Sequence, residues 1–416
     1  MNSALAALFL PTYSVCRDFD WRMAKQTQPP IIAFAPHAWD DRWLSRQQLL
    51  TRMGARGWPV LYSYGPLSLW DRGGHLWNSA PWLGRFKQQD NVWLDQPGRW
   101  PPRWPKHPAW DRWAQRRHMA RMASLFPDQR DDLTLMLFHP RFWPYVERLK
   151  PRRVLYHVYD VYSAMDQWNS ELEQWQRQLV QRADLITTSS PAMAAHLPGD
   201  GPQRARVLNN GADPAPFIAA QGCACPADLA AIPSPRIGYL GTVNSKLDLE
   251  MVLHVARTEP TWQWVFIGPV MLDGQSERDR AARGLWEQCR ALPNVHVLGA
   301  KARDAAPAYV QHMDVNAICY RVSGDDWVAH GYPVKLHEYL AVGKPVVAGP
   351  QTVIVEEFSH VAATPSTPEA WRQALGEALE AGGVGTPELR RATALQNTWD
   401  QRVDQLEGWL VEASQK

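Results

Sequence analysis

Short apolar runs alternate with amphipathic stretches along most of the chain. In the first half, the apolar runs predict buried strands at residues 31–35, 60–64, 133–138, 154–158 and 184–189. The stretches between them carry apolar residues at helical spacing and predict helices near residues 44–56, 145–150 and 171–183. Continuous apolar strands that alternate with helices are typical of a parallel sheet covered on both faces.

This pattern breaks at residues 214–235, which are rich in Ala, Pro and Gly, and we place a domain linker at 216–235. The alternation then restarts, with strands expected at 236–240, 264–267, 295–298, 315–319 and 345–348. The chain is therefore expected to form an α/β protein of two Rossmann-like domains, residues 1–215 and 236–387, facing a central cleft. The C-terminal helix, at about 388–416, is expected to pack back on the first domain.

Charge and cysteine content argue against a nucleic-acid-binding protein and against a zinc site. The 416 residues include 44 basic and 42 acidic side chains, a formal charge of +2, so no global field attracts nucleic acid. The five cysteines form no CxxC pair and show no zinc spacing, which favours a reducing compartment. We expect a cytoplasmic enzyme, peripheral at the inner face of the cell membrane, without a nucleic-acid partner.

One segment, residues 98–121, departs from the average composition. It carries seven cations against the single acid Asp111, a local net charge of +6, and four interleaved tryptophans. Such a segment suits an anionic membrane, where Lys, Arg and Trp are favoured at the interface, or a lipid-diphosphate acceptor. The alternative is a Pro-rich loop that packs its tryptophans on the domain and leaves the arginines in water.

Four segments of the second half carry recognisable motifs: 333–347, PVKLHEYLAVGKPVV; 237–248, IGYLGTVNSKLD; 266–270; and 294–299. These motifs, and 333–347 most strongly, resemble family 4 glycosyltransferases of the GT-B fold, in particular the bacterial surface-polysaccharide group. Weaker matches in the first half are 156–160, 182–191 and 210–213. The resemblance implies a GT-B architecture and a hexosyltransferase-type enzyme that uses a nucleoside-diphosphate sugar.

By this resemblance, the protein transfers a sugar to a saccharide or lipid-linked saccharide in surface polysaccharide biosynthesis, with retention and without a metal or other cofactor. Two alternatives stay open: a non-catalytic member that binds nucleotide sugar or acts as a scaffold, and a GT-B-fold nucleotide-sugar epimerase. Asp18-Phe19-Asp20 is a DxD, the metal signature of the other glycosyltransferase fold, but it precedes the first strand, and we treat it as chance.

The donor site is expected on the second domain. Glu338 lies early in a helix, where a carboxylate can accept hydrogen bonds from both ribose hydroxyls, and the resemblance assigns it this role. Gly241 and Thr242 follow a strand and let the backbone approach a diphosphate, with Lys246 as the nearest cation. The resemblance adds Gly268, Pro333 and Lys335. One position departs from the family: many members have a Glu where this chain has His330.

The acceptor side is expected on loops of the first domain. Asp160 follows a predicted strand, and as a catalytic residue it would hold or deprotonate an acceptor hydroxyl or stabilise charge at the anomeric carbon. The alternative is an Asp that caps the next helix. His139 is a second catalytic candidate and His157 a rival; either His could be structural. Trp39, Asp40 and Arg46 follow the first strand, where this fold often places acceptor contacts, although Arg46 could lie on a helix surface.

Overall fold

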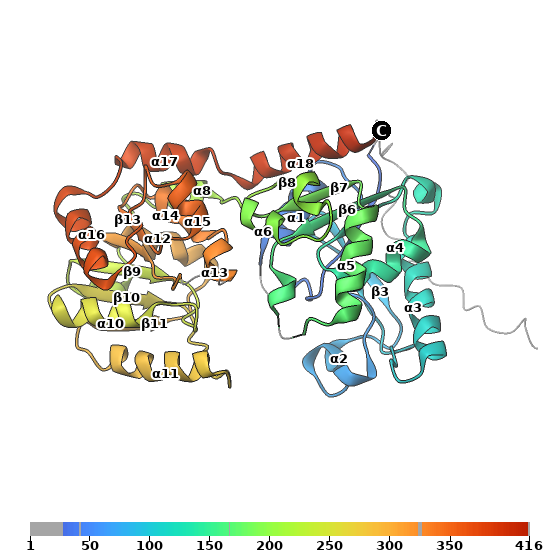
Figure 1. Cartoon of the computed structure of the whole chain (residues 1–416), viewed down its shortest axis with the longest axis horizontal. Coiled ribbons are helices and arrows are strands. Elements are labelled where there is room, and N and C mark those ends of the chain that lie inside the picture. Colours follow the sequence, from blue (N-terminus) through green and yellow to red (C-terminus); the bar gives the residue numbers. More distant parts are fainter. Residues whose placement is uncertain (1–27, 41–42, 166, 323–326, 415–416) are drawn as a thin grey trace, which may run out of the picture.

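The protein folds into two α/β domains, and the second lies beside the first (Figure 1). The computed structural model describes residues 28–40, 43–165, 167–322 and 327–414. None of the helices in these ranges is both long enough and apolar enough to cross a bilayer.

The first domain is built on one eight-stranded sheet in the order β3-β4-β2-β1-β5-β6-β7-β8, parallel except for β3 against β4. Its strands are β1 (Ile31–Phe34), β2 (Val60–Ser63), β3 (Arg85–Gln89), β4 (Val92–Gln96), β5 (Thr134–Leu137), β6 (Arg153–Val158), β7 (Leu185–Thr188) and β8 (Ala205–Val207). Its helices are α1 (Ser45–Ala55), α2 (His75–Ser79), α3 (Pro108–Ala123), α4 (Trp143–Leu149), α5 (Ser170–Arg182), α6 (Pro191–Ala195) and α7 (Gly201–Arg204).

Helices cover both faces of this sheet, as the continuous apolar strands predict. Ile32 and Phe34 of β1 pack with residues of α3, α4 and α5 on one face. Ile31 and Ala33 pack on the other face, with residues of α1 and of the C-terminal helix α18 (Trp399–Ser414). Successive side chains of a strand point to opposite faces, so β1 contributes to both halves of the core.

The second domain has a five-stranded, fully parallel sheet in the order β11-β10-β9-β12-β13. Its strands are β9 (Arg236–Leu240), β10 (Gln263–Ile267), β11 (Val295–Gly299), β12 (Val315–Ile318) and β13 (Val346–Ala348). The remaining helices are α8 (Pro214–Ala219), α9 (Ala227–Ala230), α10 (Leu249–Thr258), α11 (Glu277–Arg290), α12 (Ala306–Gln311), α13 (Trp327–His330), α14 (Lys335–Ala341), α15 (Thr352–Glu357), α16 (Pro368–Ala381) and α17 (Pro387–Leu395).

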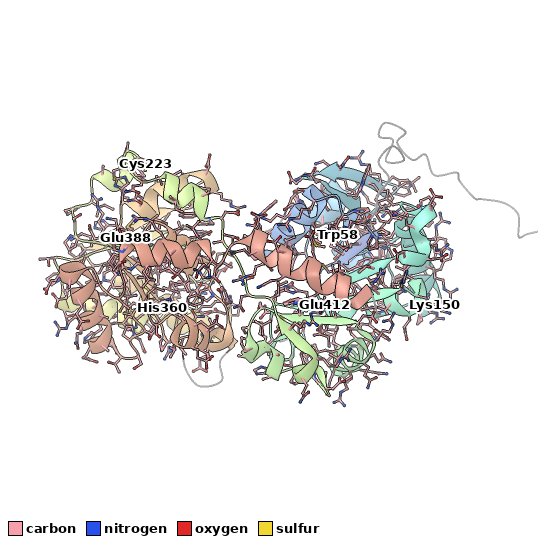
Figure 2. The ribbon with its side chains drawn as sticks, turned by 90° about the horizontal axis from the view of Figure 1, so that it is seen from above. Trp58, Lys150, Cys223, His360, Glu388 and Glu412 are labelled. Atoms are coloured by element: carbon pink, nitrogen blue, oxygen red, sulfur yellow. The ribbon has the colours of Figure 1, made fainter. Side chains whose placement is uncertain are left out.

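The chain crosses between the domains twice, and the two crossings are hydrogen-bonded to each other. The N–H of Ala212 donates to the carbonyl of Asn397 at 2.9 Å, and the N–H of Trp399 donates to the carbonyl of Ala212 at 3.2 Å. Figure 2 shows α17, marked by Glu388, on the second domain and α18, marked by Glu412, on the first. The expected return to the first domain is confirmed for α18, whereas residues 388–395 of the expected helix belong to α17 and pack on the second domain.

Three features differ from the sequence-based expectations. The segment 216–235, expected as a linker, includes α8 and α9, and α8 packs on α12, α14 and α17 of the second domain. The hairpin of β3 and β4 was not predicted. Residues 108–121 belong to helix α3, so the alternative that 98–121 is entirely a loop is wrong.

Candidate functional site: a cleft between the domains

A cavity of about 930 Å³ lies between the two domains. The second domain contributes the loops that follow β9, β10 and β11, together with the side chain of Glu338 on α14. The first domain contributes Trp43, which precedes α1, and Gln48 and Arg52, which lie on α1. The predicted donor residues Gly241, Thr242, Gly268 and Glu338 therefore all line one cavity.

Two glycines form the tight part of the cavity wall. Gly241 and Gly268 have φ values of 149° and 144°, which L side chains rarely adopt. The N–H of Gly241 donates to the carbonyl of Ile267 at 2.8 Å, and the N–H of Gly268 donates to that of Gly299 at 2.9 Å. A Cβ atom on Gly268 would overlap the carbonyl oxygen of Gly241. The wall is therefore bare backbone, which a ligand can approach closely.

Glu338 supplies the charge opposite this wall. It lies in the first turn of α14, is partly buried, and accepts no hydrogen bond from any residue that the structure describes. Burial raises the pKa of its carboxyl to about 7, although Lys335 and Arg303 oppose the rise. A carboxylate that the fold leaves without a donor is available to a ligand with hydroxyl groups.

Two of the predicted cations lie behind and beside the glycine wall rather than on the cavity surface. The ammonium of Lys335 donates to the Tyr239 hydroxyl at 3.0 Å and lies 4.1 Å from the centre of that ring. It is 2.7 Å from where a Cβ of Gly241 would be. Lys246 follows the same loop and interacts electrostatically with Asp160 of the first domain. Pro333 precedes α14 and accepts a hydrogen bond from the N–H of Leu336 at 3.0 Å.

Asp160 and His139 lie at the carboxyl edge of the first sheet, after β6 and β5. Burial raises the pKa of Asp160, and Lys246 across the cleft opposes this. One Asp160 oxygen accepts the N–H of Val161 at 3.1 Å, and the short helix that follows is not capped by Asp160. His139 Nδ1 accepts the N–H of Arg141 at 3.1 Å, and burial lowers the pKa of its imidazole to about 3.

The other first-domain candidates lie either at a second cavity or inside the domain. Trp39 and Asp40 line a second cavity, of about 650 Å³. Arg46 is 1% exposed and hydrogen-bonds Tyr159, so it lies inside the domain and not on a helix surface. His157 is buried with its Nδ1 2.8 Å from Thr187 Oγ1, and it lines neither of these two cavities.

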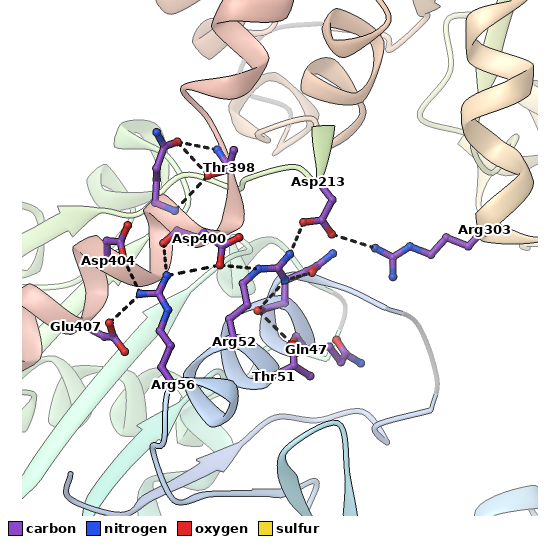
Figure 3. Close-up of polar contacts among 12 residues, drawn as sticks. Gln47, Thr51, Arg52, Arg56, Asp213, Arg303, Thr398, Asp400, Asp404 and Glu407 are labelled. Carbon is purple, nitrogen blue, oxygen red and sulfur yellow. Dashed lines mark hydrogen bonds and ion pairs between the residues drawn. The ribbon is translucent and has the colours of Figure 1, made fainter. Parts of the chain in front are cut away.

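The structure adds Trp43 and Arg52 to the site, which sequence reasoning missed, and shows what Arg303 contacts. Arg52 forms an ion pair with Asp213 at the first crossing, and Arg303 lies 3.9 Å from the same carboxylate (Figure 3). The Arg303 guanidinium also lies 5.5 Å from the centre of the Trp43 ring, across the cleft. Nothing local in the sequence marks Trp43 or Arg52, because only the packing of the domains brings them to the cavity.

Among the residues that the structure describes, no three His, Cys, Asp or Glu side chains are grouped so that they could hold a metal ion. Asp18-Phe19-Asp20 lies outside the described residues, as does the side chain of His330.

Comparison with known proteins gives one family match and many structural neighbours. Residues 234–381 match the family described as glycosyl transferases group 1. The putative teichuronic acid biosynthesis glycosyltransferase TuaH of Bacillus subtilis (strain 168) is 27% identical over 172 residues, which is 41% of each chain. The chain thus aligns with less than half the length of this curated relative.

Two solved structures share the fold over most of both chains. Anabaena HepE in complex with UDP-glucose has a TM-score of 0.65 at 15% identity, over 92% of this chain and 99% of HepE. Sucrose-phosphate synthase from Thermosynechococcus elongatus has a TM-score of 0.65 at 13% identity, over 92% of this chain and 99% of its own. The predicted GT-B fold is confirmed, and residues 234–381 of this fold are similar to the glycosyl transferases group 1 family.

Proposed function

We propose that this protein is a glycosyltransferase that moves a sugar from a nucleoside diphosphate to a hydroxyl of a saccharide or lipid-linked saccharide in polysaccharide biosynthesis. The observation that carries the proposal is the Glu338 carboxylate, which faces the interdomain cavity without a protein donor, opposite a wall of bare glycine backbone. A cavity of about 930 Å³ is in the size range of cofactor and nucleotide sites.

In this proposal, the ribose of the donor lies at Glu338, whose carboxylate accepts from two hydroxyls. The diphosphate lies against Gly241 and Gly268, where no side chain intervenes, and beside Thr242. Lys335, whose ammonium lies behind Gly241, and Lys246, which follows the same loop, offset the phosphate charge. The base then lies toward residues 300–304, with Trp43 and Arg303 beside it.

The chemical step takes place where the two domains meet. The anomeric carbon loses its bond to the diphosphate oxygen, which leaves with the nucleoside diphosphate, and gains a bond to the acceptor oxygen, while the acceptor proton passes to the Asp160 carboxylate. We assign Asp160 to the acceptor hydroxyl because it follows β6 at the carboxyl edge of the first sheet and interacts electrostatically with Lys246 of the second domain. We propose retention and no metal, as the family resemblance implies. His139 is the less favourable base, since its Nδ1 already accepts a backbone N–H.

The ligands of the structural neighbours suggest which donor base and sugar to test first. HepE was crystallised with UDP and with UDP-glucose, so UDP-sugars are the first compounds to test on this chain. We place the enzyme in the cytoplasm, where nucleotide sugars are made, in peripheral contact with the membrane through residues 98–121.

The test compares Glu338→Gln with Glu356→Gln, an exposed Glu on α15 of the same domain. Binding of UDP and UDP-glucose is measured by calorimetry and by thermal shift, since a ligand that binds only the folded state raises its stability. Loss of hydrogen bonds to a charged group is worth about 1.5–3 kcal/mol, so donor affinity should fall about tenfold to a hundredfold. Unchanged affinity in a folded Glu338→Gln protein would overturn the assigned site.

Product analysis separates the two alternative functions. A non-catalytic member binds the nucleotide but neither hydrolyses nor transfers the sugar. An epimerase converts the nucleotide sugar without any acceptor present. Transfer that requires an added acceptor supports the glycosyltransferase.

A further inference from the structure

Five tryptophans with exposed side chains gather on one corner of the first domain. Trp70, Trp82, Trp100, Trp104 and Trp113 are 37–67% exposed, and Leu76 and Leu83 are exposed among them. They come from residues 70–83, residues 100–104 and the first turns of α3, and Figure 1 shows α2 and α3 at this corner. We call these seven residues the tryptophan face. Single exposed apolar residues are ordinary, but a group of this size marks an interaction surface.

Hydrogen bonds and ring contacts hold the tryptophan face in place. The N–H of Leu69 donates to the carbonyl of Arg103 at 2.9 Å, and that of Trp100 donates to Trp82 at 3.0 Å. Trp82 and Trp100 are stacked with their centroids 6.3 Å apart. The indole of Trp110 packs against both Trp100 and Trp113. The exposed rings are therefore preorganised and lose little conformational freedom on binding.

Cations surround the tryptophan face, and few acids offset them. Asp111 is already paired with Arg103, at 3.1 and 2.8 Å. Lys106, Arg112 and Arg116 are exposed, and the Lys106 ammonium lies 5.0 Å from the centre of the Trp70 ring. Exposed indoles interleaved with cations match the interface of a bilayer with anionic headgroups, where both residue types are favoured.

The tryptophan face adjoins the cavity of about 650 Å³. Helix α2 carries Leu76 on the face, and His75, Leu76 and Ser79 of the same helix line the cavity. Trp39 and Asp40 line the cavity as well, and the Trp39 ring lies 6.1 Å from that of Trp43, which lines the donor cavity. A surface resting on the tryptophan face would therefore lie at the rim of a cavity that neighbours the donor site.

We propose that the tryptophan face docks the protein on an anionic phospholipid bilayer, and that the cavity beside α2 receives the head of a lipid-linked acceptor. The second statement rests on the proposed glycosyltransferase function; the first does not. Helix α2 contributes to both the tryptophan face and the cavity rim. An acceptor could therefore keep its lipid in the bilayer while its head group enters the cavity of the docked protein.

The docking test uses the full chain and vesicles of phosphatidylcholine with or without phosphatidylglycerol, in a sedimentation assay. The parent protein should sediment with the anionic vesicles and be released by salt. The Trp70→Ser/Trp82→Ser and Arg112→Glu/Arg116→Glu variants should each bind about tenfold more weakly or worse. The controls are Leu395→Ser/Val411→Ser, two apolar residues each 50% exposed on α17 and α18, and Arg257→Glu/Arg290→Glu on the second domain.

Hydrogen exchange locates the contact: anionic vesicles should protect amides in 69–83 and 99–116. Glu338→Gln should bind vesicles as the parent does, so failure of the donor site and failure of docking give different results. Failure of the parent to bind anionic vesicles, equal binding by all variants, or protection confined to other segments would overturn the proposal. Protection of the face by a protein or by RNA but not by vesicles would overturn it as well.

Discussion

At the scale of single residues, Glu338 has an environment that works against stability, and the two glycines of the cavity wall have conformations that no other residue would adopt readily. The carboxyl of Glu338 has a raised pKa because it is buried, and Gly268 has a backbone conformation that other residues rarely adopt. Groups of this kind persist at functional sites, where a ligand supplies what the fold leaves out.

The first prediction concerns the pH dependence of Glu338. Its pKa is about 7 in the folded protein and close to 4.5 when unfolded, so the folded state binds the proton more tightly. Stability should therefore fall as pH rises from about 4.5 to 7, and Glu338→Gln should be more stable than the parent at pH 8 by about 1 to 3 kcal/mol. Urea unfolding at pH 5 and pH 8 measures this, and an equal difference at both values would contradict it.

The affinity for the donor nucleotide should change with pH in the direction opposite to stability. The ionised carboxylate is the better acceptor for ribose hydroxyls, so the affinity of the parent for UDP should rise through pH 7. Calorimetric titration of UDP at several pH values measures the trend. The Glu338→Gln protein should show no such rise.

The second prediction uses two glycines of the same domain. Gly268→Ala should destabilise the protein by about 2 kcal/mol or more and abolish donor binding, because the new Cβ overlaps the Gly241 carbonyl. Gly284→Ala lies on the exposed side of α11 with no atom near the new Cβ, and should stabilise by about 0.5–1 kcal/mol. Thermal unfolding of both variants, with and without UDP, makes the comparison.

At the scale of elements, a buried polar cluster connects β2, β4, α3 and α4 beneath the tryptophan face. Asp95 accepts hydrogen bonds from Ser63 at 2.6 Å and from Arg121, and His118 Nε2 lies 2.7 Å from it. Burial alone would raise the pKa of Asp95, but Arg121 and His118 outweigh burial and hold it at about 2. The cluster fixes α3 against the sheet, and with it the position of the exposed indoles.

The third prediction is that Asp95→Asn loses about 3–5 kcal/mol of stability, because it leaves Arg121 buried without its partner. The control, Glu173→Gln, breaks an exposed pair with Arg177 and should cost at most about 1 kcal/mol. Since the folded pKa of Asp95 lies below the unfolded value of 3.8, its contribution is lost as pH falls from about 4 to 2. The Asp95→Asn variant should lack this acid-sensitive part in urea titrations.

The fourth prediction concerns α18. Leu406 is fully buried in the core of the first domain, and Leu406→Ala should cost about 2–5 kcal/mol. Val411 on the same helix is half exposed, and Val411→Ala should change stability by no more than about 0.5 kcal/mol. UDP affinity should be unchanged in both variants, because α18 packs on the domain that lacks Glu338.

Strands and helices could be predicted from the sequence where their buried apolar residues form a continuous run or recur at a regular spacing. The strands of both parallel sheets are continuous apolar runs, whereas β3 is a polar edge strand, RFKQQ, with no such run. Its turn was marked only by Asp90-Asn91, whose φ values of 49° and 63° are those of a tight hairpin. Helix α3 was hidden because its charged and Trp residues are spread around the helix without an apolar stripe.

At the scale of the whole molecule, the cavity exists only because two domains meet. The sequence motifs identified Gly241, Gly268 and Glu338, which one domain positions. Trp43, Arg52 and the Asp213–Arg303 contact depend on the domain arrangement, and no local pattern predicts them.

The fifth prediction follows from this contact across the cleft. Arg303→Ala removes the cation beside Trp43 and one that opposes the raised pKa of Glu338, so UDP affinity should fall severalfold and the pKa of Glu338 should rise further. Arg290→Ala, an equally exposed Arg on α11, is the control. Unchanged UDP affinity in Arg303→Ala would show that the cleft contact does not contribute to the donor site.

The paired crossings at Ala212 and Thr398 have a consequence for building chimeras with related enzymes. The core of the first domain includes Trp399 and Leu406, which follow the second crossing, and that of the second domain includes Ala394, which precedes it. A chimera with a single junction near residue 213 would therefore combine the first domain of one enzyme with the α18 helix of the other. Two junctions, one at each crossing, would transplant the donor lobe and keep the native helix 399–414 on its own partner.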